Sequence, residues 1–386
     1  MERLKLGLSA LIVAAGTWTA SYTVSARAAE SEKPMKLGVF FGSYGDVDSG
    51  DEAYELVTTT LQDPDMVPLP RVVRHALAEL GWLIKRKSIR EEYLAIGGRS
   101  NYRAVSQAQA DQVAENLRQR GYDAKGYTGF AFTFPHVDVG MAKAEHDGVN
   151  RLVVFYQGAQ HSRVTSHIIF REVKKYLKAH PTWQVKVTAV KSFSADPRFE
   201  DLVADSILSE IDSNFPGAAP SDVCIFLPMH GNIMNWINQG DPSYNQMMGV
   251  VEAMRSRFAG YPIYYGFQNH DELPALKWTQ PKDLDAIRSL AKDHCSKVVI
   301  NGRISYTIDN LETLYDHAIM EKEHLIAESE KLGLPKKVVV ASMFNLEPPF
   351  VDYLADLTDE ALSGEGRLLE ISEIDAVRPP LSDEEG

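Results

Sequence analysis

Short apolar runs that alternate with amphipathic segments constrain the fold of this chain more than any other feature. Runs rich in Val, Ile, Leu and Phe are typical of strands and lie at residues 36–41, 151–156, 184–190, 223–227, 262–267, 297–302 and 337–342. The segments between them carry apolar residues at helical spacing, at residues 72–83, 106–120, 166–180, 199–213, 244–258, 284–293 and 311–332. This alternation predicts parallel sheets flanked by helices, and the strands suffice for two sheets.

A histidine and a file of carboxylates follow two of these predicted strands. His230 stands where the run 223–228 ends, and open α/β sheets bind ligands at the carboxyl ends of their strands. Beyond the run 297–302, Asp309, Glu312 and Asp316 recur at helical spacing and share one face. A neutral imidazole and a row of carboxylates suit a reaction that removes protons and handles a cation. The alternatives are a structural histidine and acids that favour a helix N-terminus.

The length and composition are those of an ordinary globular protein. The chain has 386 residues, of which 44% are hydrophobic and 24% are charged. That length allows two domains of roughly 150 residues each. The formal net charge is −13, so we expect no nucleic-acid partner, because phosphate backbones repel an acidic surface.

The two ends of the chain differ from the rest. Residues 1–28 combine basic residues (Arg3, Lys5), an apolar stretch at 6–16 and the small-residue pattern Ala26-Arg27-Ala28, which is typical of a secretory signal peptide. The sequence therefore predicts export to the periplasm, with an uncleaved amino-terminal anchor as the alternative. Residues 366–386 are acidic and contain proline, so we expect a disordered tail.

Cysteine usage leaves two possibilities open. The chain contains two cysteines, Cys224 and Cys295, each in or just before a predicted strand. They allow a single disulfide in an oxidising compartment, and two buried thiols are the alternative. Their spacing does not match a metal cluster.

A series of segments, read in chain order, resembles the ferrochelatase family. The resemblance covers roughly residues 36–360 and is carried by residues 39–42, 61–70, 96–100, 129–135, 160–165, 229–231, 240–244, 278–285, 309–315 and 344–350. It implies an α/β fold of two similar Rossmann-like domains, each a four-stranded parallel sheet flanked by helices, with a tetrapyrrole cleft between them. We expect the first domain at 33–180, completed by about 333–365, and the second at 181–332.

The resemblance also implies roles for individual residues. His230 and Glu312 match the family's catalytic pair, and Asp316 extends the acid row that meets the metal, whereas Met320 takes the place of a third acid. Inserting a metal strips two N–H protons from the pyrroles, so a base must face the ring and anions must attract the cation. The residues that would contact the porphyrin are Phe130, Phe132, His161, Ser162, Met229, Tyr244, Trp278 and Asp309.

Several positions depart from the family pattern near the expected cleft. Ala131 and Phe132 replace an arginine and a tyrosine, and Asn310 replaces a histidine. His161 and His167 add two imidazoles that are candidate metal ligands. Met229 beside His230 matches the ligand set of a haem iron, although packing is the simpler explanation for a methionine in a strand.

The expected reaction is the insertion of Fe²⁺ into protoporphyrin IX to give haem, which would make the protein a ferrochelatase-like lyase. A non-catalytic periplasmic carrier of haem or porphyrin and a chelatase for another divalent metal such as cobalt are the alternatives. Metal and tetrapyrrole would be substrates, so we expect no permanently bound cofactor and no iron–sulfur cluster. If the protein is a carrier, we expect it to hold bound haem. Peripheral contact with a membrane is a further expectation, and the oligomeric state stays open.

Overall fold

The first of two parallel sheets is built from the amino-terminal half of the chain. The computed structural model describes residues 34–269, 276–364 and 368–369. Four parallel strands are ordered β2 (Asp123–Phe130), β1 (Lys36–Ser43), β3 (Arg151–Tyr156) and β4 (Lys186–Val190). A two-residue strand, β9 (Leu368–Leu369), adds antiparallel to the outer edge of β4, within the stretch where we expected disorder. The rest of that tail, like the expected signal peptide, lies outside the described residues.

The second sheet also has four parallel strands. Their order is β6 (Ile263–Gln268), β5 (Val223–His230), β7 (Lys297–Ile300) and β8 (Lys337–Val340). The expected architecture of two four-stranded parallel sheets flanked by helices is therefore confirmed. Both sheets alternate strand and helix along the chain, as parallel pairing requires.

Two strands, β4 and β8, belong to a different sheet from the one that the expected domain boundaries assign to them. Strand β4 follows residue 180 but pairs with β3, from Arg151 opposite Lys186, so it completes the first sheet. Strand β8 lies in the segment 333–365 but pairs with β7, from Lys297 opposite Lys337. From that segment, helix α11 (Pro348–Ser363) is the part that packs against the first sheet, on β3 and β4.

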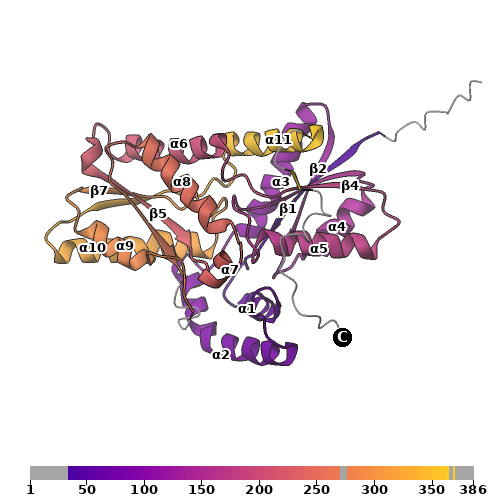
Figure 1. Ribbon diagram of the computed structural model, residues 1–386, viewed down its shortest axis with the longest axis horizontal. Coiled ribbons are helices and arrows are strands. Elements are labelled where there is room, and N and C mark those ends of the chain that lie inside the picture. The colour runs from indigo at the N-terminus through magenta and orange to yellow at the C-terminus, as the bar shows by residue number, and fades with distance from the viewer. Residues whose placement is uncertain (1–33, 270–275, 365–367, 370–386) are drawn as a thin grey trace, which may run out of the picture. The chain divides into compact units, whose positions relative to one another are not determined.

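Helices cover both faces of each sheet (Figure 1). The first sheet packs α3 (Tyr102–Gln119) and α11 on one face, and α4 (Val137–His146) and α5 (Ser166–Ala179) on the other. The second sheet carries α9 (Asp283–Ala291) and α10 (Lys322–Lys331) on one face. The remaining helical elements are α1 (Ala53–Gln62), α2 (Arg71–Ala95), α6 (Pro197–Asn214), α7 (Met234–Asn238), α8 (Ser243–Arg257), the 3₁₀ turn η1 (Pro220–Asp222) and the π-helix η2 (Glu312–Glu321).

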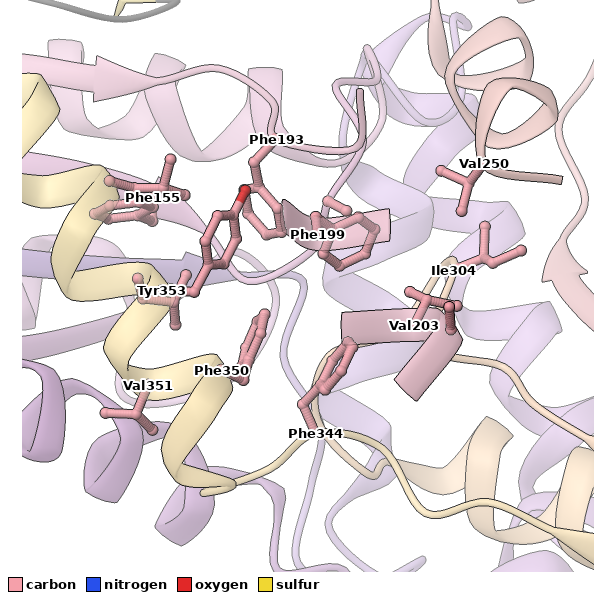
Figure 2. Packing of buried hydrophobic residues seen from close by; sticks show 14 of the residues in the cluster. Phe155, Phe193, Phe199, Val203, Val250, Ile304, Phe344, Phe350, Val351 and Tyr353 are labelled. Carbon is pink, nitrogen blue, oxygen red and sulfur yellow. The ribbon is translucent and has the colours of Figure 1, made fainter. Parts of the chain in front are cut away.

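Alternating side chains of the central strands supply the cores on the two faces. In β5, Ile225, Leu227 and Met229 join one large buried cluster together with α6 and α8, whereas Cys224 and Phe226 pack on the other face against α9. The large cluster is shared by both sheets, and Figure 2 shows its aromatic centre around Phe193, Phe199, Phe344, Phe350 and Tyr353. This continuous core fixes the two sheets relative to each other.

A disulfide joins Cys224 of β5 to Cys295, just before β7. The two Cα atoms lie 5.8 Å apart because β5 and β7 are paired neighbours. The alternative of two buried thiols is therefore wrong in this structure. Among residues 34–269 and 276–364, no helix combines the length and apolar character that crossing a bilayer requires.

Candidate active site

His230 is the last residue of β5 and presents its imidazole at the carboxyl end of the second sheet. Its side chain is 41% exposed, whereas the preceding Met229 is fully buried on the opposite face of the strand. His230 Nδ1 lies 2.6 Å from the carbonyl oxygen of Gly231. A carbonyl can only accept, so Nδ1 carries the hydrogen and the neutral ring keeps a free lone pair on Nε2. The base site of this imidazole therefore faces outward.

Glu312 lies opposite that lone pair. Glu312 Oε1 is 3.6 Å from His230 Nε2. Glu312 is the first residue of the π-helix η2. The sequence pattern predicts an ordinary helix over 311–332, and the structure divides it into η2 and α10. π-Helical turns are rare in proteins, and those that occur often lie at functional sites. This one carries both Glu312 and Asp316.

Two further side chains hold the Glu312 carboxylate. Asn269 Nδ2 donates to Oε1 at 2.8 Å, and the Tyr306 hydroxyl donates to Oε2 at 2.6 Å. Asn269 follows β6 and has a φ of 67°, a left-handed conformation that asparagine tolerates better than most residues. The carboxyl ends of β5, β6 and β7 thus converge on one carboxylate.

Asp316 lies on the same helix in a more buried setting. Burial, with the added negative charges of Glu312 and Glu321, raises the pKa of Asp316 to about 9. Gln268 Nε2 donates to Asp316 Oδ2 at 3.4 Å. At neutral pH this carboxyl holds a proton, which a bound cation would displace because it offsets the same repulsion.

Other acids surround this pair. On the helix α2, burial raises the pKa of Glu92, and the charge of Glu312 adds to that rise. Below Asp316, His317 Nδ1 and Glu321 Oε2 lie 2.9 Å apart, and both side chains are fully buried. Burial raises the pKa of Tyr306 well above its ordinary value, and the charge of Glu312 raises it further. Its phenol therefore remains a hydrogen-bond donor.

Tyr244 and Trp278, both expected to contact the porphyrin, line one cavity. Its volume is about 590 Å³, and Met234, Lys277 and Lys282 complete much of its wall. Trp278 also lies against Gly231, where an added Cβ would come within 3.3 Å of the indole. The cavity wall therefore adjoins the residue next to His230. Its aromatic and cationic lining suits a flat ring with acidic substituents.

The structure corrects the expected roles of three residues in the core. Phe130 and Met229 are 1% and 0% exposed, so neither presents its side chain to a ligand. Because successive side chains of a strand point to opposite faces, Met229 and His230 cannot bind one iron together. Phe132 is also buried and packs against Tyr44, with ring centroids 4.6 Å apart.

The remaining expected contacts are occupied within the protein. His161 is buried, its Nδ1 lies 2.6 Å from Ser166 Oγ, and its ring stacks on Phe170. Burial lowers the pKa of His161 to about 4, and a nearby lysine contributes. Ser162 Oγ donates to Asp241 at 2.8 Å. Asp309 accepts from the backbone N–H of Met343 and from Asn345 Nδ2, which ties the start of the π-helix segment to the loop after β8.

The expectation that His161 and His167 bind a metal is not supported by their surroundings. Both are buried within or beside α5. Among the described residues, one set of three cysteine, histidine or acidic ligands lies close enough for a metal, namely Cys224, Asp293 and Cys295. Its two sulfur atoms are already joined in the disulfide.

Sequence reasoning missed three residues of the site. Gln268 and Asn269 directly follow a predicted strand, so the strand-end rule that found His230 would have found them too. Tyr306 lies between β7 and η2 without a recognisable pattern, and its role is apparent only from its contact with Glu312.

A larger surface groove lies elsewhere. It has a volume of about 980 Å³ and follows the edge of β2, lined by polar residues of α3, α4 and α5. It contains none of the convergent groups described above, so the site is assigned from chemistry and not from volume.

Comparisons with known proteins agree with this geometry. The ferrochelatase family model matches residues 36–362. The chain is 25% identical over 333 residues to the ferrochelatase of Gloeothece citriformis, covering 85% of this chain and 83% of that protein. It is 26% identical over 364 residues to the mitochondrial ferrochelatase of Bos taurus, covering 90% and 84%. Among solved structures, SirB from Bacillus subtilis with Fe³⁺ shares the fold, with a TM-score of 0.52 and 12% identity over 86% of this chain and 98% of that chain. The chain therefore belongs to the ferrochelatase family, which implies a metal chelatase with a tetrapyrrole and a metal ion as substrates.

Proposed function

We propose that this protein inserts Fe²⁺ into protoporphyrin IX. The observation that carries the proposal is the 3.6 Å approach of His230 Nε2 to Glu312 Oε1, with Asp316 on the same helix. One base and two carboxylates at the carboxyl end of a parallel sheet supply the groups that metal insertion needs.

The chemistry can be divided among these residues. Insertion breaks two pyrrole N–H bonds, binds the dication to the ring nitrogens and releases two protons. His230 takes one of these protons on Nε2, which the hydrogen bond from Nδ1 to the Gly231 carbonyl leaves free, and the second proton passes to water. The charged Glu312 attracts the cation, and Asp316 gives up its proton as the cation binds beside it. The cation loses water as it moves towards the ring. The ring would rest against Tyr244 and Trp278, with Lys277 and Lys282 near its propionates.

No resident cofactor is required in this scheme. In this proposal metal and tetrapyrrole are both substrates. The pairing of the chain's two cysteines in the disulfide supports the absence of an iron–sulfur cluster, because such clusters are held by several thiolates.

We further propose that the protein acts in the periplasm after cleavage behind Ala28. The disulfide between Cys224 and Cys295 supports export, because disulfides persist in oxidising compartments. Intact-mass analysis of protein recovered from the periplasm tests this. A mass that retains residues 1–28 would indicate an anchored form.

Contact with a membrane surface is proposed for α2. This helix packs on α1 and touches η2, and Figure 1 shows both helices together at one edge of the fold. Val72, Leu83 and Ile84 on α2 are 82%, 58% and 69% exposed. Co-sedimentation with anionic vesicles, compared between the wild type and Leu83→Glu/Ile84→Glu, tests this contact.

A haem carrier is the second candidate function. The exposed His230 imidazole favours it, because the free Nε2 can bind haem iron as well as it can accept a proton. Met229 cannot serve as the second iron ligand, since it is buried on the other face of β5.

One experiment separates the candidates. The purified protein is incubated without oxygen with protoporphyrin IX and Fe²⁺, Co²⁺ or Zn²⁺, and metalloporphyrin is followed by absorption. Product that exceeds the protein many times over supports a chelatase, and the preferred metal identifies the substrate. A stoichiometric complex with haem and no turnover would support the carrier.

A further inference from the structure

Tyr306 is a half-buried tyrosine whose hydroxyl contacts the Glu312 carboxylate directly. It lies after β7, and its hydroxyl donates to Glu312 Oε2 at 2.6 Å. The same oxygen accepts a hydrogen bond from Gln268 Nε2 at 3.2 Å. The hydroxyl is thus used both as a donor and as an acceptor.

Gln268 extends this contact to the second carboxylate. Its side chain is 1% exposed, and the amide nitrogen that reaches Tyr306 also lies 3.4 Å from Asp316 Oδ2. Glu312, Tyr306, Gln268 and Asp316 therefore form one hydrogen-bonded array. The neighbouring Asn269 holds the other oxygen of Glu312.

Asn310, which replaces a histidine of the family pattern, has a structural role at the start of the helix that carries Glu312. Asn310 Oδ1 accepts from the backbone N–H of Thr313 at 3.0 Å, so its side chain caps the start of the helix. Support for the Glu312 carboxylate comes instead from residues at the ends of β6 and β7.

The neutrality of the array matters for a site that must take up a cation. An arginine or lysine in the same place would orient Glu312 equally well, but its charge would repel the incoming dication. A phenol and an amide satisfy the carboxylate oxygens by hydrogen bonds and leave the negative charge available.

We propose that Tyr306 is the positioning residue for both carboxylates of the site. It holds Glu312 towards His230 and, through Gln268, keeps Asp316 at a fixed place relative to Glu312, so that one dication can pass from the buried carboxylate to the carboxylate that faces the ring. This inference rests on the proposed chelatase function and deepens it.

The test compares Tyr306→Phe with a matched control. Tyr264 in β6 also donates its hydroxyl to a carboxylate, Asp293, at 2.7 Å, but outside the site. We expect Tyr306→Phe to lower kcat for metal insertion about 10- to 100-fold, because a misplaced reactive group costs rate at this scale. The KM for porphyrin should stay within about twofold, since the ring contacts Tyr244 and Trp278 instead. Tyr264→Phe should leave both constants unchanged.

A double-mutant cycle guards against an effect of misfolding. Gln268→Met removes the amide from the array at similar volume, and its effect on kcat should be strongly non-additive with that of Tyr306→Phe. Additive effects, or a Tyr306→Phe variant with kcat within about twofold of the wild type, would overturn the proposal.

Failure of the proposed function gives a different result. If the wild type turns over no metal with porphyrin, the array is tested by titrating the purified protein with Co²⁺ and following the visible absorption of the bound ion. We expect Tyr306→Phe to weaken Co²⁺ binding at least about fivefold, whereas Tyr264→Phe leaves it unchanged. Equal affinity in all three proteins would show that Tyr306 does not position the carboxylates.

Discussion

His230 Nε2 and Glu312 Oε1 lie 3.6 Å apart, one at the end of β5 and the other at the start of the π-helix η2. The distance is too long for a hydrogen bond, and a carboxylate has no hydrogen to donate, so the imidazole lone pair stays available.

Glu312→Gln should lower metal insertion about 100-fold while the affinity for free-base porphyrin changes little. The amide keeps the shape of the side chain and removes the charge that handles the metal or its protons. Steady-state rates and fluorescence titration with protoporphyrin measure the two effects. A variant with normal turnover would remove Glu312 from the catalytic role.

Asp316→Asn should make the stability of the protein less dependent on pH. The folded pKa of about 9 lies above the ordinary value of 3.8, so the folded state binds the proton more tightly than the unfolded state. The wild type therefore loses stability as the pH rises between these two values. Asp316→Asn lacks the titrating group, so it does not show this pH-dependent loss of stability. We expect the unfolding free energy of the variant to exceed that of the wild type by at least about 1 kcal/mol near pH 8, measured by urea denaturation. A difference in unfolding free energy between the variant and the wild type that is constant from about pH 5 to pH 9 would contradict a buried, protonated Asp316.

His161 should contribute to acid sensitivity and not to metal binding. Its folded pKa of about 4 lies below the ordinary 6.5, so its stabilising contribution is complete above pH 6.5 and declines as the pH falls towards 4. His161→Gln should flatten the loss of thermal stability across this range and leave Fe²⁺ insertion within about twofold. The half-buried His136, which contacts Glu55, provides the control, as His136→Gln. A large loss of metal affinity in His161→Gln would restore His161 as a ligand.

Much of the sheet architecture could be predicted because its central strands are buried on both faces. Strands such as β5 and β7 are continuous apolar runs, which local sequence identifies directly. Strand β2 was missed because Asp123, Lys125 and Gly126 interrupt its apolar pattern. Gly126 is required there, since a Cβ would meet the backbone of Ala110 in α3 at 2.4 Å.

The site was predictable where function coincides with a local signal. His230 ends a strand and Glu312 and Asp316 share a helix face, and each signal lies within a short segment. Periodicity could not indicate which sheet each strand joins, where the π-helical turn forms or what Tyr306 contacts. These features depend on residues that are far apart in sequence. The burial of Met229 and Phe130 could not be predicted from local sequence either, because it depends on which face of a strand meets the core.

The most direct measurement of the central claim is a comparison of the wild type with His230→Ala in turnover and in binding of free-base protoporphyrin and haem. If His230 accepts pyrrole protons, the variant loses insertion of Fe²⁺ by about 100-fold or more, while free-base porphyrin binds with nearly unchanged affinity. Unchanged turnover in His230→Ala would contradict the account, because the imidazole at the end of β5 would then have no part in the reaction.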